Sequence, residues 1–285
     1  MVNRRTTAGL AVAAAVLIAG ASAAEEPEDG WSDSAELSYV VTAGNSETST
    51  FAFKNTLARE WEKSGLTVRL GALRAESKTT SRTAVGTPAA FGVVERSTTD
   101  VTAENYFLNG RYDREITDRL VWYVGAGWDR NRPSGIQNRT IGEAGVGHTW
   151  YDTDELKFET LYAATYTRQD DVVAQPGRED SFAGVRFSWD YQNRFGANAT
   201  YANVLVLDDN LDDTSRWRGD MTNSLAVNLS SRLALKAGLQ WRYENEPAFR
   251  VVALENPLGT PTGLTVPVEL DNLDSVFTVS LVFNL

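Results

Sequence analysis

A chain of 285 residues with 42% hydrophobic and 10% aromatic side chains carries too much apolar surface to remain disordered. It contains no cysteine, which excludes disulfide frameworks, thiolate zinc sites and thiol catalysis. Its formal net charge of -11 disfavours nucleic-acid binding, which needs a basic surface, and its single histidine leaves little room for imidazole chemistry.

The first segment, residues 1–23, has the pattern of a cleaved secretory signal peptide. Arg4 and Arg5 precede a short apolar run at 9–20, and small residues occupy positions 21–23 before the expected cleavage point. The apolar run is shorter than the roughly 20 residues that a membrane-spanning helix needs. We therefore expect export, followed by a short periplasmic segment at 24–32.

From residue 33 to the C-terminus the dominant pattern is alternation of apolar and polar side chains, the period of a strand with two different faces. At the C-terminus, for example, Phe277, Val279 and Leu281 alternate with Thr278 and Ser280. Each such segment reaches the roughly 9–11 residues of a membrane-spanning strand. In chain order the predicted strands are 33–42, 48–61, 66–76, 101–113, 120–129, 139–150, 156–166, 181–191, 195–207, 214–229, 233–244 and 275–285.

The connections between these strands are sorted by length. Those after even-numbered strands are short, whereas several after odd-numbered strands are long: 77–100, 130–138, 167–180 and 245–274. Outer-membrane barrels have this asymmetry, with periplasmic turns at one rim and extracellular loops at the other. The sequence therefore predicts an all-β, transmembrane, antiparallel up-and-down barrel of about twelve strands over residues 33–285.

Aromatic side chains gather near the predicted strand ends, where membrane–water interfaces favour amphipathic rings. The predicted interface aromatics are Trp61, Tyr112, Trp122, Trp128, Trp150, Tyr166, Trp189, Tyr191, Trp217, Trp241 and Tyr243.

The polar side chains that alternate with the apolar ones lie on the other face of each predicted strand and carry many charges of both signs. We expect this face to line the barrel interior. The predicted lumen-lining residues are Lys54, Arg69, Arg111, Asp129, Glu143, Lys157, Glu159, Arg186, Asp190, Arg216, Arg218, Asp220, Lys236 and Arg242. Such side chains either line a narrow selective channel or pair with one another and block it. Long loops at 77–100 and 245–274 could also fold inward as plugs.

Three short segments resemble landmarks of a known family. They are Gly44-Asn45-Ser46-Glu47-Thr48, Leu108-Asn109-Gly110-Arg111-Tyr112-Asp113 and Gly145-Val146-Gly147-His148, the last with His where Tyr is expected. Together they resemble the YdiY-like family, described as salt-induced outer-membrane proteins with a domain of unknown function. The resemblance implies a β-barrel in the outer membrane, and it implies no mechanism.

Two candidate chemical sites have simpler interpretations. His148 would need a nucleophile within hydrogen-bond reach to act in a lipase or protease, but its phase places it on the outer face as an interfacial ring. The acidic run at 208–213 lacks the spacing of a calcium loop and is expected to be a solvated tip. We expect no catalytic residue, metal or cofactor.

The favoured function is a narrow channel or an envelope-integrity barrel with a charge-lined lumen. A barrel enzyme and a surface-binding barrel acting through its long loops are the alternatives. The expected partners are outer-membrane lipid and lipopolysaccharide, barrel-insertion machinery that reads the C-terminal strand, and a small solute or ion, with no nucleic acid.

Overall fold

A computed structural model describes residues 30–42, 46–87, 90–175 and 177–284. The predicted signal peptide at 1–23 lies outside the described residues, as does most of the segment at 24–32. Within the described part of the chain, no helix is long and apolar enough to cross a membrane.

The described chain consists of strands joined by turns and loops. Their bounds are β1 Trp31–Thr42, β2 Ser46–Trp61, β3 Ser64–Thr87, β4 Ala90–Thr117, β5 Leu120–Asn131, β6 Ile136–Asp152, β7 Leu156–Asp171, β8 Ser181–Phe195, β9 Ala199–Asn210, β10 Arg218–Asn228, β11 Leu233–Glu244, β12 Phe249–Glu255, β13 Pro261–Glu269 and β14 Leu273–Asn284.

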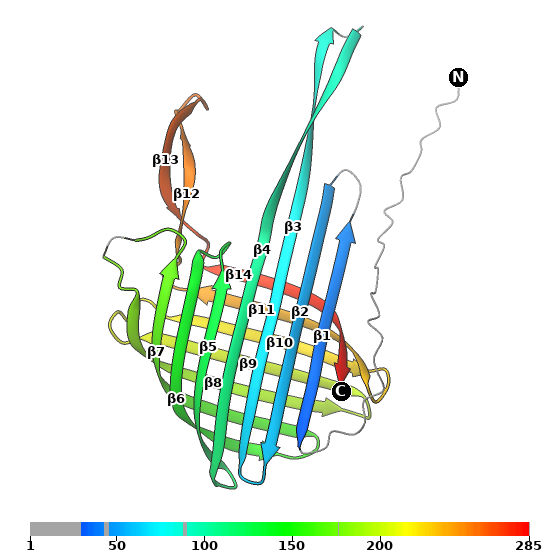
Figure 1. Ribbon diagram of the computed structural model, residues 1–285, viewed down its shortest axis with the longest axis vertical. Coiled ribbons are helices and arrows are strands. Elements are labelled where there is room, and N and C mark those ends of the chain that lie inside the picture. Colours follow the sequence, from blue (N-terminus) through cyan, green and yellow to red (C-terminus); the bar gives the residue numbers. More distant parts are fainter. Residues whose placement is uncertain (1–29, 43–45, 88–89, 176, 285) are drawn as a thin grey trace, which may run out of the picture.

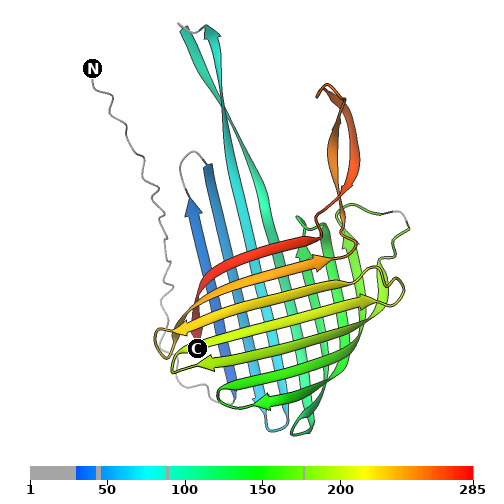
Figure 2. The same cartoon turned by 180° about the vertical axis from the view of Figure 1, so that it is seen from behind.

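Twelve of these strands form one closed antiparallel barrel in the order β1-β14-β11-β10-β9-β8-β7-β6-β5-β4-β3-β2 (Figures 1 and 2). The remaining pair, β12 and β13, forms a separate hairpin inserted between β11 and β14. Closure leaves the wall without a free strand at either end of the sheet. The prediction of an all-β, twelve-stranded antiparallel barrel is confirmed.

The alternation predicted from the sequence is visible as two faces of the wall, most clearly in β7. Leu161, Ala163 and Thr165 are buried, whereas the intervening Tyr162 and Tyr166 are 50% and 61% exposed on the outside. A strand with this period has one face against the packed interior and the other against its surroundings. The register of the neighbouring strands extends the inward phase around the barrel.

Connections at the two rims differ as expected. Short turns at 62–63, 118–119, 153–155, 196–198 and 229–232 lie at one end, and the longer connections lie at the other. Strand β1 begins and β14 ends at the short-turn end, where Ser34 pairs with Asn284.

The two longest predicted loops are instead largely strands. The segment at 77–100 continues the β3–β4 ladder as a ribbon beyond a bulge at Ala75 and Glu76, with Thr80 bonded to Ser97 at 2.9 Å. The segment at 245–274 contains the β12–β13 hairpin. Both hairpins project beyond the barrel rim and do not fold inward as plugs (Figures 1 and 2). Their Thr and Val content favours paired strands.

The seam that closes the barrel is short. Strand β1 pairs with β14 over the short stretch from Ser34 to Leu37. On its other side, β14 pairs with β11 over the much longer stretch from Leu273 to Phe283. Figure 1 shows the outer half of β1 continuing upward while β14 curves away across the back.

Candidate functional site: a charged lumen crossed by ion pairs

The interior of the outer half of the barrel holds a connected network of charged side chains centred on Asp208. Its carboxylate accepts hydrogen bonds from Arg186 at 2.7 and 3.1 Å and from Arg218 at 3.0 Å. Arg186 also donates to Glu143 at 2.7 Å. The Asp208 side chain is 12% exposed and those of the two arginines 17% and 16%, so these charges interact largely shielded from bulk water.

A second part of the network reaches across the lumen. Arg139 on β6 forms a two-point hydrogen bond with Asp129 on neighbouring β5, at 2.9 and 3.0 Å. Its Nη1 atom also lies 3.5 Å from a carboxylate oxygen of Glu244 on β11. Strand β11 is five places from β6 in the twelve-stranded order, so this ion pair joins nearly opposite walls.

Further contacts across the lumen accompany this pair. With its carboxamide turned so that oxygen and nitrogen both meet complementary partners, Asn131 donates to the backbone carbonyl of Glu104 at 2.7 Å and accepts from Nη1 of Arg242 at 3.3 Å, which links β5 to β11, six places away. At the rim above, Ser134 donates to Asp274. Ala248, against the Gly135 backbone, is 1% exposed. The outer end of the lumen is therefore crossed by side chains and rim residues from opposite walls.

The other half of the barrel holds two smaller charged groups. Lys236 donates to Glu36 at 2.8 Å, and Lys54 lies 3.6 Å from the same carboxylate, which connects β11, β1 and β2 around the short seam. Arg111 lies 3.7 Å from Glu159 and places its guanidinium 4.4 Å from the ring centre of buried Tyr123.

The remaining predicted lining residues occupy different surroundings. Asp190 on β8 lies opposite Glu159 of β7 in the strand register, and Arg69 on β3 lies opposite Asn109 of β4. Asp220 accepts from Gln240 at 2.7 Å and from Arg242 at 3.3 Å. Lys157 lies at the turn end of β7, where its side chain is 65% exposed and 3.4 Å from Asp152.

Two strand boundaries change the predicted site. Arg216, expected on a strand at 214–229, lies in the connection before β10 and stacks on Phe182 at 5.3 Å. Asp208, expected in a solvated tip at 208–213, is inside β9 and is central to the network. Apolar Val204 and Val206 share its inward phase, so alternation of polarity did not extend the predicted strand to it. Arg139 and Asn131 were also missed as lumen residues.

The predicted interface aromatics include several that lie on the outer wall. Tyr112 and Trp122 contact each other at 5.8 Å toward the short-turn end, and Trp217 stacks on Tyr243 at 4.9 Å toward the other. The indole nitrogen of Trp189 donates to the carboxamide oxygen of Asn203 at 2.6 Å. Both side chains lie on the outward face of the wall, so the bond gives each polar group a partner away from water. His148 packs edge-on against Trp150 at 4.5 Å. Among the described residues, no group of carboxylate or imidazole side chains is arranged to hold a metal ion.

The topology and the paired charges inside the wall define a closed, antiparallel β-barrel of the architecture found in outer-membrane proteins. More specifically, the chain belongs to the family described as "Protein of unknown function, DUF481", which matches residues 35–252. No curated protein matches the chain.

The chain is similar to several solved barrels at low sequence identity. A NanC porin is 11% identical with a TM-score of 0.46, covering 88% of this chain and 98% of its own. A KdgM porin in complex with disordered oligogalacturonate is 6% identical with a TM-score of 0.41, covering 89% and 98%. The anion-selective porin from Comamonas acidovorans is 12% identical with a TM-score of 0.35, covering 90% and 98%.

Proposed function

We propose that this protein is an outer-membrane barrel that conducts small ions through a narrow lumen, and that the charged network closes the lumen in the conformation described. The observation that carries the proposal is the ion pair between Arg139 and Glu244, which joins nearly opposite walls. Breaking this contact removes one link between the walls and leaves every strand paired.

Membrane placement is the first part of the proposal. A closed barrel satisfies the backbone polar groups of its wall internally, which a lipid environment requires. Export after cleavage at residue 23 would bring the chain to the outer membrane, with the short turns on the periplasmic side. Lipid and lipopolysaccharide would surround the wall, and insertion machinery would read the alternating pattern of β14.

The chemistry of the closure supports a gate more than a fixed plug. Well-packed apolar residues are often as stable as a buried ion-pair network, or more so, because charges lose hydration on burial. A closure that served only stability would not need Arg139, Arg186 and Arg218 at its centre. Charged side chains, in contrast, can replace their contacts with each other by contacts with water or ions as the lumen opens.

The composition of the network predicts a weak preference for cations. It contains five carboxylates against four guanidinium groups, a formal excess of one negative charge. The residues are Asp129, Glu143, Asp208, Asp220 and Glu244 against Arg139, Arg186, Arg218 and Arg242.

The test is Glu244→Gln in a planar bilayer. This change removes the charge opposite Arg139 but leaves Arg139 bonded to Asp129. A partly exposed ion pair without a hydrogen bond contributes about 1 kcal/mol, so the ratio of open to closed time should rise roughly fivefold. The matched control is Glu155→Gln in the exposed turn before β7, which should conduct like the wild-type protein. Silent bilayers for both the wild type and Glu244→Gln would contradict conduction.

A surface-binding role is a second candidate, favoured by the two projecting hairpins. Exposed apolar side chains occur on both, including Val85 and Val93 on the ribbon and Leu258 and Leu264 on the β12–β13 hairpin. Contiguous exposed apolar side chains often mark contact surfaces. We propose no catalytic role, because the described ring contact of His148 is with Trp150.

A further inference from the structure

The short seam between β1 and β14 leaves the outer part of each strand with one free edge. Pairing between the two strands ends at Leu37 and Leu281. Within the described chain, β1 continues to Thr42 paired with β2 alone, and β14 runs from Leu273 to Ser280 paired with β11 alone. Figures 1 and 2 show the two strands diverging beyond the seam. The backbone groups along these facing edges therefore lack the second strand partner that a closed wall provides.

The free edges lie within the membrane if the barrel is placed as proposed above. Trp241 and Tyr243, two of the predicted outer-interface aromatics, pair with Ser275 and Leu273 of β14. Residues 276–280 follow between this level and the seam, on the membrane side of the aromatic side chains. Unpaired backbone groups at this depth are tolerated only where they meet protein or line a water-filled space. This requirement indicates that the edges border an opening into the lumen.

The side chains beside the free edges are apolar and are not packed against a neighbouring strand. Val40 shares the inward phase of Glu36 but is 43% exposed, whereas the inward side chains in the middle of β7 are buried. The adjacent Tyr39, on the outward face, is also exposed, as are Phe277 and Val279 on β14. Strand β1 is therefore accessible on both faces here, and the border of the opening suits a hydrocarbon chain.

A group of charges lies at the base of the opening, on the lumen side. Glu36 is paired with Val282, one position before the seam ends, and its carboxylate accepts a hydrogen bond from Lys236 at 2.8 Å. Lys54 lies 3.6 Å from the same carboxylate, and its side chain is 41% exposed. Two ammonium groups for one carboxylate leave a formal excess of one positive charge. This excess favours an anionic group, and Lys54 is the more exposed of the two lysines.

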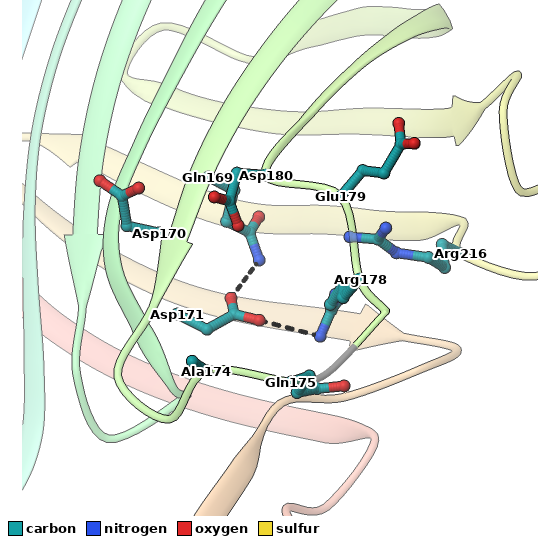
Figure 3. A pocket seen from close by; sticks show the side chains of 9 residues that line it. All are labelled: Gln169, Asp170, Asp171, Ala174, Gln175, Arg178, Glu179, Asp180 and Arg216. Atoms are coloured by element: carbon teal, nitrogen blue, oxygen red, sulfur yellow. Dashed lines mark hydrogen bonds and ion pairs between the residues drawn. The ribbon is translucent and has the colours of Figure 1, made fainter.

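The cavity at the outer end of β7 offers no comparable place for an anion. It has a volume of about 190 Å³, and four carboxylates line it against two arginines. Figure 3 shows Arg178 paired with Asp171, which also accepts a hydrogen bond from Gln169. The excess of negative charge around this cavity repels an anion, so the base of the seam is the more favourable position.

We propose that the facing edges of β1 and β14 form a lateral opening between the lumen and the outer half of the bilayer, and that this opening binds a long-chain fatty acid. The carboxylate of the fatty acid meets Lys54 inside the lumen. Its hydrocarbon chain passes between the edges, beside Val40 and Phe277, into the lipid. The inference rests on the membrane placement proposed above and does not require the barrel to conduct ions, so the two proposals can fail separately.

The test is photolabelling of the full-length chain, folded in phospholipid vesicles, with hexadecanoic acid that carries a diazirine in its chain. Peptide mapping should find the label concentrated on residues 38–42 and 273–280. The methyl ester of the same probe, which has no charge, should label these residues about fivefold less, which is the effect of one partly exposed ion pair. Lys54→Gln should reduce labelling by the acid to a similar extent. The matched control is Lys157→Gln at the turn end of β7, which should label like the wild-type protein.

Three results would overturn the lateral opening: label spread evenly over the outward wall, equal labelling by the acid and its ester, or unchanged labelling in folded Lys54→Gln. A protein strand bound along the edges would exclude the probe, and the missing enrichment would overturn fatty-acid binding as well. Folding of each variant is checked by the heat-dependent shift of its band on a denaturing gel. If Lys54→Gln does not fold, the comparison of acid and ester on the wild-type protein decides the question, because it changes no residue.

Discussion

Asp208→Asn should be the most destabilising single charge change in the lumen. The wild-type carboxylate accepts three hydrogen bonds from Arg186 and Arg218 and is 12% exposed. Removing one partner of a buried ion pair costs about 3–5 kcal/mol, because the remaining charge stays buried without compensation. Arg186 keeps Glu143 at 2.7 Å, which places the expected loss near the lower end, at about 3 kcal/mol.

The assay is urea unfolding of the barrel in lipid vesicles, followed by tryptophan fluorescence under conditions where folding is reversible. A loss of about 3 kcal/mol corresponds to a roughly 100-fold smaller ratio of folded to unfolded protein. The matched control is Asp209→Asn, the next residue on β9, whose Oδ1 atom is buried without a hydrogen bond. This control should not lower stability, because it removes a charge whose buried oxygen has no hydrogen-bond partner.

A second variant separates loss of charge balance from loss of packing. Asp208→Asn combined with Arg218→Met removes both a carboxylate and the guanidinium that depends on it. Replacing both partners of a buried pair is often close to neutral, so the double variant should regain much of the lost stability. Equal stability of Asp208→Asn and Asp209→Asn, or no recovery in the double variant, would refute the assignment of Asp208 as the centre of the network.

Two further predictions concern the wall and the ribbon. Gly71→Ala should destabilise the barrel by about 1–3 kcal/mol in the same unfolding assay, because its new Cβ would overlap the ring of Phe107. Gly110→Ala, which meets open space, should be nearly neutral, and similar losses in the two variants would contradict the packing argument. Replacing residues 80–97 by an Asn-Gly turn should leave a folded barrel, because there β3 and β4 pair only with each other. Failure of that variant to show the heat-dependent gel shift would mean that the ribbon supports the wall.

Alternation was sufficient to predict the wall because the two-residue period of a strand is local. Each of the twelve predicted segments overlaps a barrel strand, and an even number of strands brings the first and last strands' free ends to the same rim. Alternation did not predict the strands of the ribbon, because its composition suits both loops and strands. The ribbon after Ala75 is rich in Ser and Thr, which are common in loops, yet in pairs across two strands these residues also stabilise a hairpin.

The sequence by itself determined which face of each strand points inward, and hence that the lumen is charged. Only the tertiary structure decided which of those charges meet. Arg139 and Glu244 are separated by more than a hundred residues, and their contact depends on how closely the opposite walls approach. That distance is set by the strand order, tilt and register of the whole barrel together, and no local pattern of residues encodes it.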